Sequence, residues 1–324
     1  MAGSPNAQTL ICEDFNSALE QLLREGMRLE IVFPADSPHT ALLTRDGARF
    51  RLTSRPDAPR ASAGLPGFRP EFVLTGAGTE SGEGRAGMLY RDLIPGRLGG
   101  RYIASHIAIE AGGPVADWVH YHHVALQLIC VRRGWVRVVY QDQGEPFVMA
   151  AGDLVLQPPG IRHRVLESSP GFEAVEITCP ASHETFADHE MVLPNGEPDL
   201  RKGYQGQRFL HHVAARSPWA AWNGAEAQST AVREASGGLA EARTIRPGAL
   251  PLLAVPHHDG ELVFGFVLEG SARLGHGEGH QLGPADAFVI PPGEEWRLSE
   301  MSDDFRLLHV ATGIVPGCWA GGKA

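Results

Sequence analysis

The chain has 324 residues, of which 43% are hydrophobic and 20% charged, a balance that is ordinary for a globular protein. Its formal net charge is −10, and it contains no run of lysines or arginines, which argues against nucleic acid or an anionic membrane surface as a partner. The 39 glycines and 24 prolines favour the many tight turns of a mainly β protein.

The N-terminus lacks the basic region and apolar run of a signal peptide. No apolar segment approaches the ~20 residues that a membrane-spanning helix needs. The 4 cysteines show no C-x-x-C spacing, so no disulfide framework is expected. We therefore expect a cytoplasmic protein with no membrane partner.

Residues 1–55 are predicted to fold as a small α+β module. Asp14 can cap a helix that ends before Gly26, and Asp46-Gly47 is a strong signal for a β-hairpin. The expected elements are a strand, a helix and three more strands, at residues 8–12, 15–25, 28–33, 40–44 and 49–53. This order resembles one module of the glyoxalase and vicinal-oxygen-chelate superfamily. That family normally pairs two modules around a metal, so a single module must dimerise or pack on the rest of the chain.

Three stretches of different composition and hydrophobic pattern follow the module. Residues 56–87 are rich in glycine, proline, serine and glutamate and are expected to form a linker. Residues 88–180 contain many short, alternating apolar segments, which predict a barrel or sandwich. Residues 181–235 lose this pattern and are interpreted as a connector that could contain a short helix. The histidines of the connector are expected to be surface or packed residues: His183, His189, His211 and His212.

Residues 236–315 repeat the plan of residues 88–180. The plainest match is Ala-Gly-Asp-Leu-Val-Leu-Gln-Pro-Pro-Gly at 151–160 against Pro-Ala-Asp-Ala-Phe-Val-Ile-Pro-Pro-Gly at 284–293. An internal repeat of this length indicates a duplicated domain.

A group of histidines in the first repeat has the spacing of a metal site. His120 and His122 lie in a strand-like segment and share one face, because side chains alternate along a strand. His163 follows the turn that closes a second strand. If the two strands are neighbours in a small barrel, the three imidazoles can converge inside it. Neutral imidazole suits iron, zinc, copper and nickel, whereas packed or surface histidines are the alternative interpretation.

Both repeats resemble cupin domains, over roughly residues 88–315. In the first repeat, the H-x-H of the first cupin motif is followed by Gln127, where glutamate is usual, and then by Gly134. The second motif is matched by four residues at every spacing: Gly152, Pro158, Gly160 and His163. Glu167 stands in place of its asparagine. The resemblance implies a mainly β fold, with two cupin barrels preceded by the small α+β module.

The resemblance also implies one divalent metal per chain, held by His120, His122 and His163. Gln127 loses the charge of the usual glutamate, and its amide oxygen is a weaker ligand. It could be a weak fourth ligand, a hydrogen-bond donor to bound substrate or dioxygen, or a satisfied buried polar group. We favour a site of three histidines, with Gln127 next to it as the catalytic candidate.

The second repeat has lost this ligand set. His258 keeps the position of the second histidine, whereas the other positions hold Pro256, Val263 and Trp296. One ligand does not hold a metal, so no metal is expected in the second barrel. His257, His258 and Glu261 form an alternative cluster, which we interpret as turn residues.

Strand parity gives expectations for the neighbours of the site. Trp118 should share the inward face with His120, whereas Tyr121 and His123 should point away from the metal. Arg162 could offer a guanidinium to a carboxylate substrate, but alternation from His163 favours a solvated position.

Three functions remain open. The first is an Fe(II) dioxygenase that cleaves a C–C bond in a small aromatic or diketone acid, as the three-histidine cupin oxygenases imply. The second is a non-redox lyase, isomerase or hydrolase that uses zinc, nickel or manganese, with Glu167 or Tyr102 as candidate bases. The third is a small-molecule-binding protein without turnover. Iron is the favoured metal, the substrate is a small molecule, and a homodimer is expected.

Overall fold

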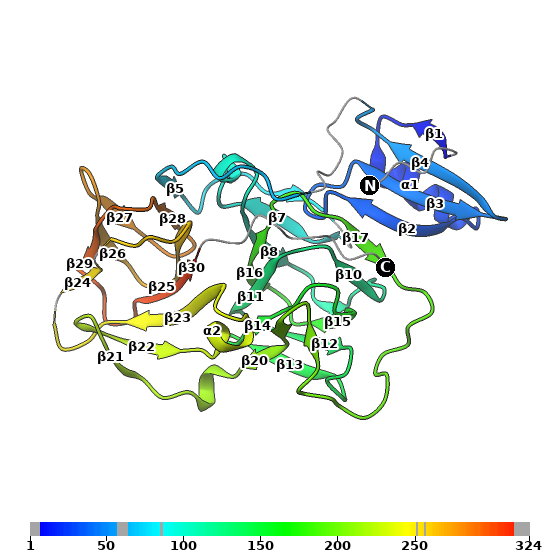
Figure 1. Cartoon of the computed structure of the whole chain (residues 1–324). Helices are drawn as coiled ribbons and strands as arrows, with labels where there is room; N and C mark the ends of the chain where they lie inside the picture. Colours follow the sequence, from blue (N-terminus) through cyan, green and yellow to red (C-terminus); the bar gives the residue numbers. More distant parts are fainter. Residues whose placement is uncertain (1–6, 57–63, 85–86, 251, 256, 314–324) are drawn as a thin grey trace.

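The computed structural model describes residues 7–56, 64–84, 87–250, 252–255 and 257–313. It is a mainly β protein in which a small α+β module is followed by two β-barrels, as the sequence predicted. The first barrel lies between the module and the second barrel (Figure 1). Among the described residues, no helix has both the length and the apolar character that crossing a bilayer requires.

The N-terminal module has the predicted β-α-β-β-β order. Its elements are β1 (Gln8–Ile11), α1 (Phe15–Arg24), β2 (Arg28–Phe33), β3 (Thr40–Arg45) and β4 (Ala48–Thr53). Asp14 caps the helix, because its Oδ1 accepts a hydrogen bond from Ser17 N at 3.1 Å. Asp46 and Gly47 both have positive φ, at 51° and 78°, so they form the tight turn between β3 and β4.

The sheet of the module continues into the first barrel through one short strand. β17 (Thr185–Ala187) pairs with β2 on one side and with β10 (His120–His122) on the other. Figure 1 shows this strand between the module and the barrel. The module therefore packs on the rest of the chain, which was one of the two outcomes expected for a single module.

The first barrel is built from two facing sheets. One sheet continues from β10 through β15 (His163–Ser168), β12 (Trp135–Tyr140) and β13 (Phe147–Ala150), with β9 (Gly113–Pro114) paired to β15. The other has the order β20 (Leu210–His212), β14 (Leu154–Leu156), β11 (Leu126–Arg133), β16 (Phe172–Cys179), β8 (Ile103–Ile109), β7 (Leu89–Asp92) and β6 (Gly82–Glu83).

The second barrel has the same two-sheet plan. The larger sheet has the order β21 (Ala220–Trp222), β22 (Ala225–Ser229), β23 (Ala240–Arg246), β30 (Arg306–Thr312), β25 (Leu262–Glu269), β28 (Ala287–Ile290) and β5 (Val73–Thr75). The smaller sheet has the order β24 (Leu252–Val255), β29 (Trp296–Ser299), β26 (Ala272–Gly275) and β27 (His280–Leu282). The remaining elements are short: 3-10 turns at Arg97–Gly99 and Ala214–Arg216, the hairpin β18 (Gly203–Tyr204) with β19 (Gln207–Arg208), and α2 (Val232–Ala235).

Two stretches are more ordered than their composition indicated. The expected linker, residues 56–87, contributes β5 to the second barrel and β6 to the first. Phe72 and Val73 explain this, because they pack against the cores of the barrels. The expected connector, residues 181–235, supplies β17 and β20 to the first barrel and β21 and β22 to the second, along with the predicted short helix.

A shared core holds the two barrels together. One apolar cluster includes residues of both, among them Leu128 and Phe264. At its edge, Arg101 forms a two-pronged ion pair with Glu261, with N–O distances of 2.7 and 2.9 Å. Tyr102 donates to the same carboxylate at 2.9 Å and is fully buried. These contacts remove Tyr102 as the candidate base of a metal site, and they occupy Glu261 of the alternative cluster.

Candidate metal centre

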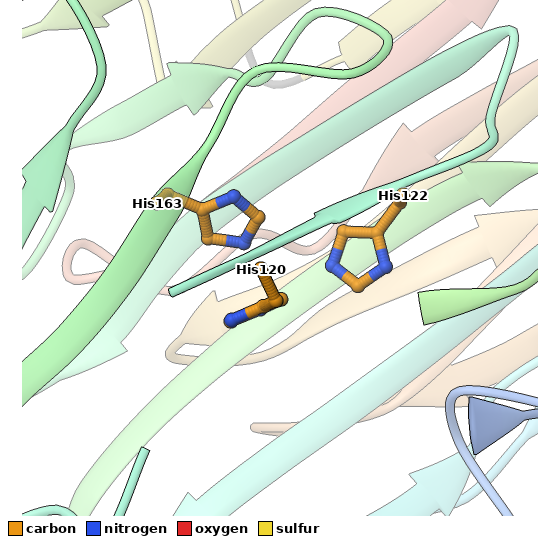
Figure 2. Close-up of side chains that lie close together, drawn as sticks. All are labelled: His120, His122 and His163. Atoms are coloured by element: carbon orange, nitrogen blue, oxygen red, sulfur yellow. The ribbon is translucent and has the colours of Figure 1, made fainter. Parts of the chain in front are cut away.

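The structure brings the three predicted histidines together. His120 and His122 project from β10, and His163 begins β15. The two strands are antiparallel neighbours, and His120 lies directly opposite His163 in the register. Residues that are paired in this way project from the same face of a sheet. The three rings therefore converge on one point inside the first barrel (Figure 2).

The distances fit a site for a single ion. The ring centroid of His163 lies 4.1 Å from that of His120 and 5.2 Å from that of His122. One nitrogen from each ring lies within 4.8 Å of the other two. All three side chains are at least nine-tenths buried. Among the residues that the structure describes, this is the one group of histidine, cysteine and carboxylate side chains that meets such a spacing.

The backbone selects the nitrogen that each ring offers. His120 Nδ1 lies 2.7 Å from the carbonyl oxygen of Trp118, and His163 Nδ1 lies 3.1 Å from that of Ile161. A carbonyl oxygen only accepts, so both Nδ1 atoms carry the hydrogen and both Nε2 atoms keep a lone pair. The buried Asp117 carboxylate lies 3.6 Å from His120 Nδ1 and favours the same arrangement. Metal-binding histidines in proteins are commonly anchored in this way.

His122 is held by a residue that the sequence analysis did not single out. Its Nδ1 lies 3.0 Å from Thr185 Oγ1, and this threonine is fully buried on β17. If His122 Nδ1 carries the hydrogen and donates it to the Thr185 hydroxyl, Nε2 of this ring also keeps a lone pair for a metal. The donor set therefore suits one divalent transition ion, as expected from three neutral imidazoles.

His183 also lies beside the cluster, although its position in the expected connector gave no sign of this. Its ring centroid is 5.3 Å from that of His122, and the side chain is buried. Its Nδ1 faces the carbonyl oxygen of Pro180 at 3.3 Å, which leaves Nε2 as an acceptor without a partner among the described residues. Burial lowers the pKa of His183, so the ring is neutral near pH 7.

Gln127 belongs to a chain of buried hydrogen bonds. Tyr140 donates to Gln157 at 2.9 Å, and Gln157 donates to Gln127 Oε1 at 2.7 Å. Gln127 Nε2 in turn donates to Glu176 at 2.9 Å. The ring of Tyr140 stacks on that of His163, with centroids 5.4 Å apart, so the chain starts beside the metal ligands. The amide oxygen of Gln127 is thus engaged with Gln157 in this structure.

The neighbours of the cluster follow the strand parity. The ring of Trp118 lies 5.1 Å from that of His120 and packs against the core of the N-terminal module. His123 turns away toward Glu184, at 3.6 Å. Arg162 also points away: it stacks on the outward-facing Tyr121, 4.1 Å from the ring centroid. Its Nε lies 2.9 Å from Asp188 Oδ2, so Arg162 is in an ion pair on the outer face.

Comparisons with known proteins agree with this architecture. The family described as the cupin domain matches residues 105–179, which include all three histidines. No curated protein matches the chain. The glyoxalase resemblance of residues 1–55 is not tested by these comparisons and stays a prediction.

Several solved structures share the fold at low sequence identity. Salicylate 1,2-dioxygenase from Pseudaminobacter salicylatoxidans has a TM-score of 0.54 at 16% identity, with 76% of this chain and 86% of that chain covered. A variant of Bacillus subtilis oxalate decarboxylase has a TM-score of 0.53 at 12% identity, covering 77% and 79%. Protein Ylba from Escherichia coli has a TM-score of 0.54 at 10% identity, covering 78% and 94%. Residues 105–179 therefore match the cupin domain, within a fold similar to that of these proteins.

Proposed function

We propose that the protein is an Fe(II)-dependent dioxygenase that acts on a small aromatic or diketone acid. The observation that carries the proposal is the set of three buried histidines, whose ring nitrogens converge with no carboxylate among them. A neutral ligand set leaves the full charge of a divalent ion to attract an anionic substrate. It also leaves coordination positions open, as catalytic sites require. The likeness to salicylate 1,2-dioxygenase supports the fold of such an enzyme.

The residues of the chain have distinct tasks in this proposal. When bound, iron supplies a template on which substrate and oxygen meet, and it exchanges electrons with them. His120, His122 and His163 hold the ion, and the backbone carbonyls and Thr185 orient their rings. Gln127 gives one amide hydrogen to Glu176 and keeps the other for a bound substrate.

A non-redox metal enzyme is the second candidate, and one observation favours it. His183 places a neutral imidazole beside His122, and the Glu176 carboxylate, which accepts from Gln127, acts electrostatically on His183, so either could serve as a general base. Zinc, nickel or manganese would then polarise a substrate carbonyl. Glu167, the base considered from the sequence, lies farther along β15, opposite Arg137.

Oxygen consumption separates the two candidates. Metal-free protein is loaded with Fe(II) or with Zn(II) under anaerobic conditions, and oxygen uptake is then followed with salicylate or with a 2,4-diketo acid. We expect uptake coupled to product formation with iron, and neither with zinc. His163→Ala removes one of the three ligands, so it should abolish the uptake.

His123→Ala is the matched control, because this neighbouring histidine faces away from the cluster and should leave uptake unchanged. Product formation without oxygen, or with zinc, would contradict the dioxygenase and support the non-redox enzyme. Tight binding of the acids without turnover by either metal form would contradict both enzymes and leave a binding protein.

A further inference from the structure

The second barrel keeps the backbone framework of the metal site. In the first barrel, Gly160 N donates to the carbonyl oxygen of His122 at 3.2 Å. In the second, Gly293 N donates to that of His258 at 3.0 Å. This shared hydrogen bond places His258 where the first barrel has a metal ligand, as the sequence repeat predicted. Three residues beyond each glycine, the first barrel has His163 and the second has Trp296.

The strand pairing identifies two further replacements. His309 on β30 lies opposite Arg243 on β23, as Glu176 on β16 lies opposite Ser105 on β8. Glu176, which accepts a hydrogen bond from Gln127 in the first barrel, is thus replaced by a histidine, and the serine opposite it by an arginine. A carboxylate and a hydroxyl of the first interior are thus replaced in the second by an imidazole and a guanidinium.

The replaced groups are buried polar side chains with open hydrogen-bonding atoms. His309 and Trp296 are only 3% and 2% exposed. Within the described part of the chain, neither ring nitrogen of His309 has a partner, and neither does Trp296 Nε1. The same holds for Arg243 Nε and His258 Nδ1. Buried polar atoms are rarely left in this state, so several of them in one barrel point to a missing partner.

These groups are neighbours. The rings of Trp296 and His309 stack with centroids 5.7 Å apart, and the ring of Trp222 lies 5.5 Å from that of His309. Arg243 lies over the ring of Trp222, at 4.5 Å from its centroid. The strand positions beside them carry residues of the apolar core of the second barrel, such as Ile245. The cluster therefore faces the interior of this barrel.

The electrostatics of the cluster favour an anion. Arg243 gives one guanidinium nitrogen to Glu241 at 2.7 Å, and its Nε remains available. Burial, together with the charges of Arg243 and His258, lowers the pKa of His309 to about 3. His309 is therefore neutral near pH 7 and offers one donor and one acceptor. No carboxylate is among the groups that shift this pKa.

We propose that the interior of the second barrel binds a small organic carboxylate with an apolar body, at a site separate from the metal centre. Its oxygens accept hydrogen bonds from Trp296 Nε1 and Arg243 Nε, and His309 supplies a third polar contact. The apolar body lies against the surrounding core, which includes Val263 and Phe288. This is a binding function beyond the proposed oxygenase, because no metal ligand takes part.

The test uses benzoate as the probe, with benzamide as its uncharged counterpart. Calorimetric titration of the wild-type protein should show a benzoate site that benzamide does not occupy. Trp296→Phe keeps an aromatic ring but removes the N–H donor, and Arg243→Gln removes the charge. Each should weaken benzoate binding at least about tenfold, because a charge-assisted contact is lost. Trp219→Phe is the matched control, because the ring of Trp219 lies under Arg246 and Arg306, whereas Arg243 of the cluster lies over Trp222.

His163→Ala distinguishes this site from the metal centre, because it should leave the benzoate affinity unchanged. Loss of benzoate binding in His163→Ala, together with normal binding in Trp296→Phe, would place the ligand at the metal centre and overturn the proposal. A crystal structure grown with benzoate that shows only water beside Trp296 and His309 would overturn it as well. Circular dichroism of each variant checks that a loss of benzoate binding does not result from unfolding.

Discussion

Single residues decide what the first barrel can bind. The histidine spacing predicted which three side chains converge, because strand alternation and one tight turn are local features. The anchors of the rings were not predictable in the same way. A carbonyl two residues away holds His120 and another holds His163, whereas His122 depends on Thr185, which is 63 positions later in the chain. Such a contact exists only once the fold has formed.

His309 gives a prediction for the pH dependence of stability. Its pKa in the folded protein is about 3, against ~6.5 for an unperturbed histidine. Below pH 6.5, His309 is therefore protonated in the unfolded chain but stays neutral in the folded protein, so the free energy of unfolding falls as the pH drops. His309→Gln stays neutral and avoids this loss. Between pH 7 and pH 5, the wild type should lose about 2 kcal/mol more than the variant in free energy of unfolding.

Urea denaturation at the two pH values measures this difference. The buried histidines outside the second barrel titrate in both proteins, so their contribution cancels in the comparison. Equal losses of stability in the wild type and His309→Gln would show that His309 is protonated in the folded protein at pH 5.

At the scale of elements, β17 joins two parts of the molecule. It pairs with β2 of the module and with β10 of the first barrel, and it carries Thr185 to the metal ligands. This strand could not be predicted, because Thr-Phe-Ala is too short for a period of two to stand out. The longer strands, such as β12 and β16, lie within the stretch of alternating segments predicted to form a barrel, because alternation over many residues is a clear signal.

Thr185→Val tests the link between β17 and the metal centre. Valine keeps the shape of threonine but removes the hydroxyl that holds His122, so metal affinity should fall about 10–100-fold. Competition with a chelator of known affinity measures the change. Thr53→Val is the matched control, because the hydroxyl of this buried threonine bonds to Thr40 and to Arg55 N, away from the metal ligands. An unchanged metal affinity in Thr185→Val would mean that the hydroxyl does not orient the ligand.

For the molecule as a whole, the duplication of the barrel could be predicted from the sequence, whereas the way in which the parts of the chain pack together could not. The repeated Pro-Pro-Gly turns predicted two similar barrels, and the structure contains both. The strands that residues 64–84 add to the barrels could not be predicted, because glycine and proline dominate that stretch and mask its short apolar run. The ion pair of Arg101 with Glu261 likewise joins residues 160 positions apart. The expected homodimer stays a prediction. The N-terminal module does not require it, because β2 already pairs with β17 next to the first barrel.

Elemental analysis after reconstitution shows whether His120, His122 and His163 hold one metal ion per chain. The wild-type protein should contain about one divalent metal per chain, His163→Ala should contain none, and His258→Ala should retain one. His258 is the useful control, because it occupies the equivalent of a ligand position in the barrel that has lost the ligand set. A metal-free wild type after reconstitution, or a metal that survives His163→Ala but is lost in His258→Ala, would contradict the account.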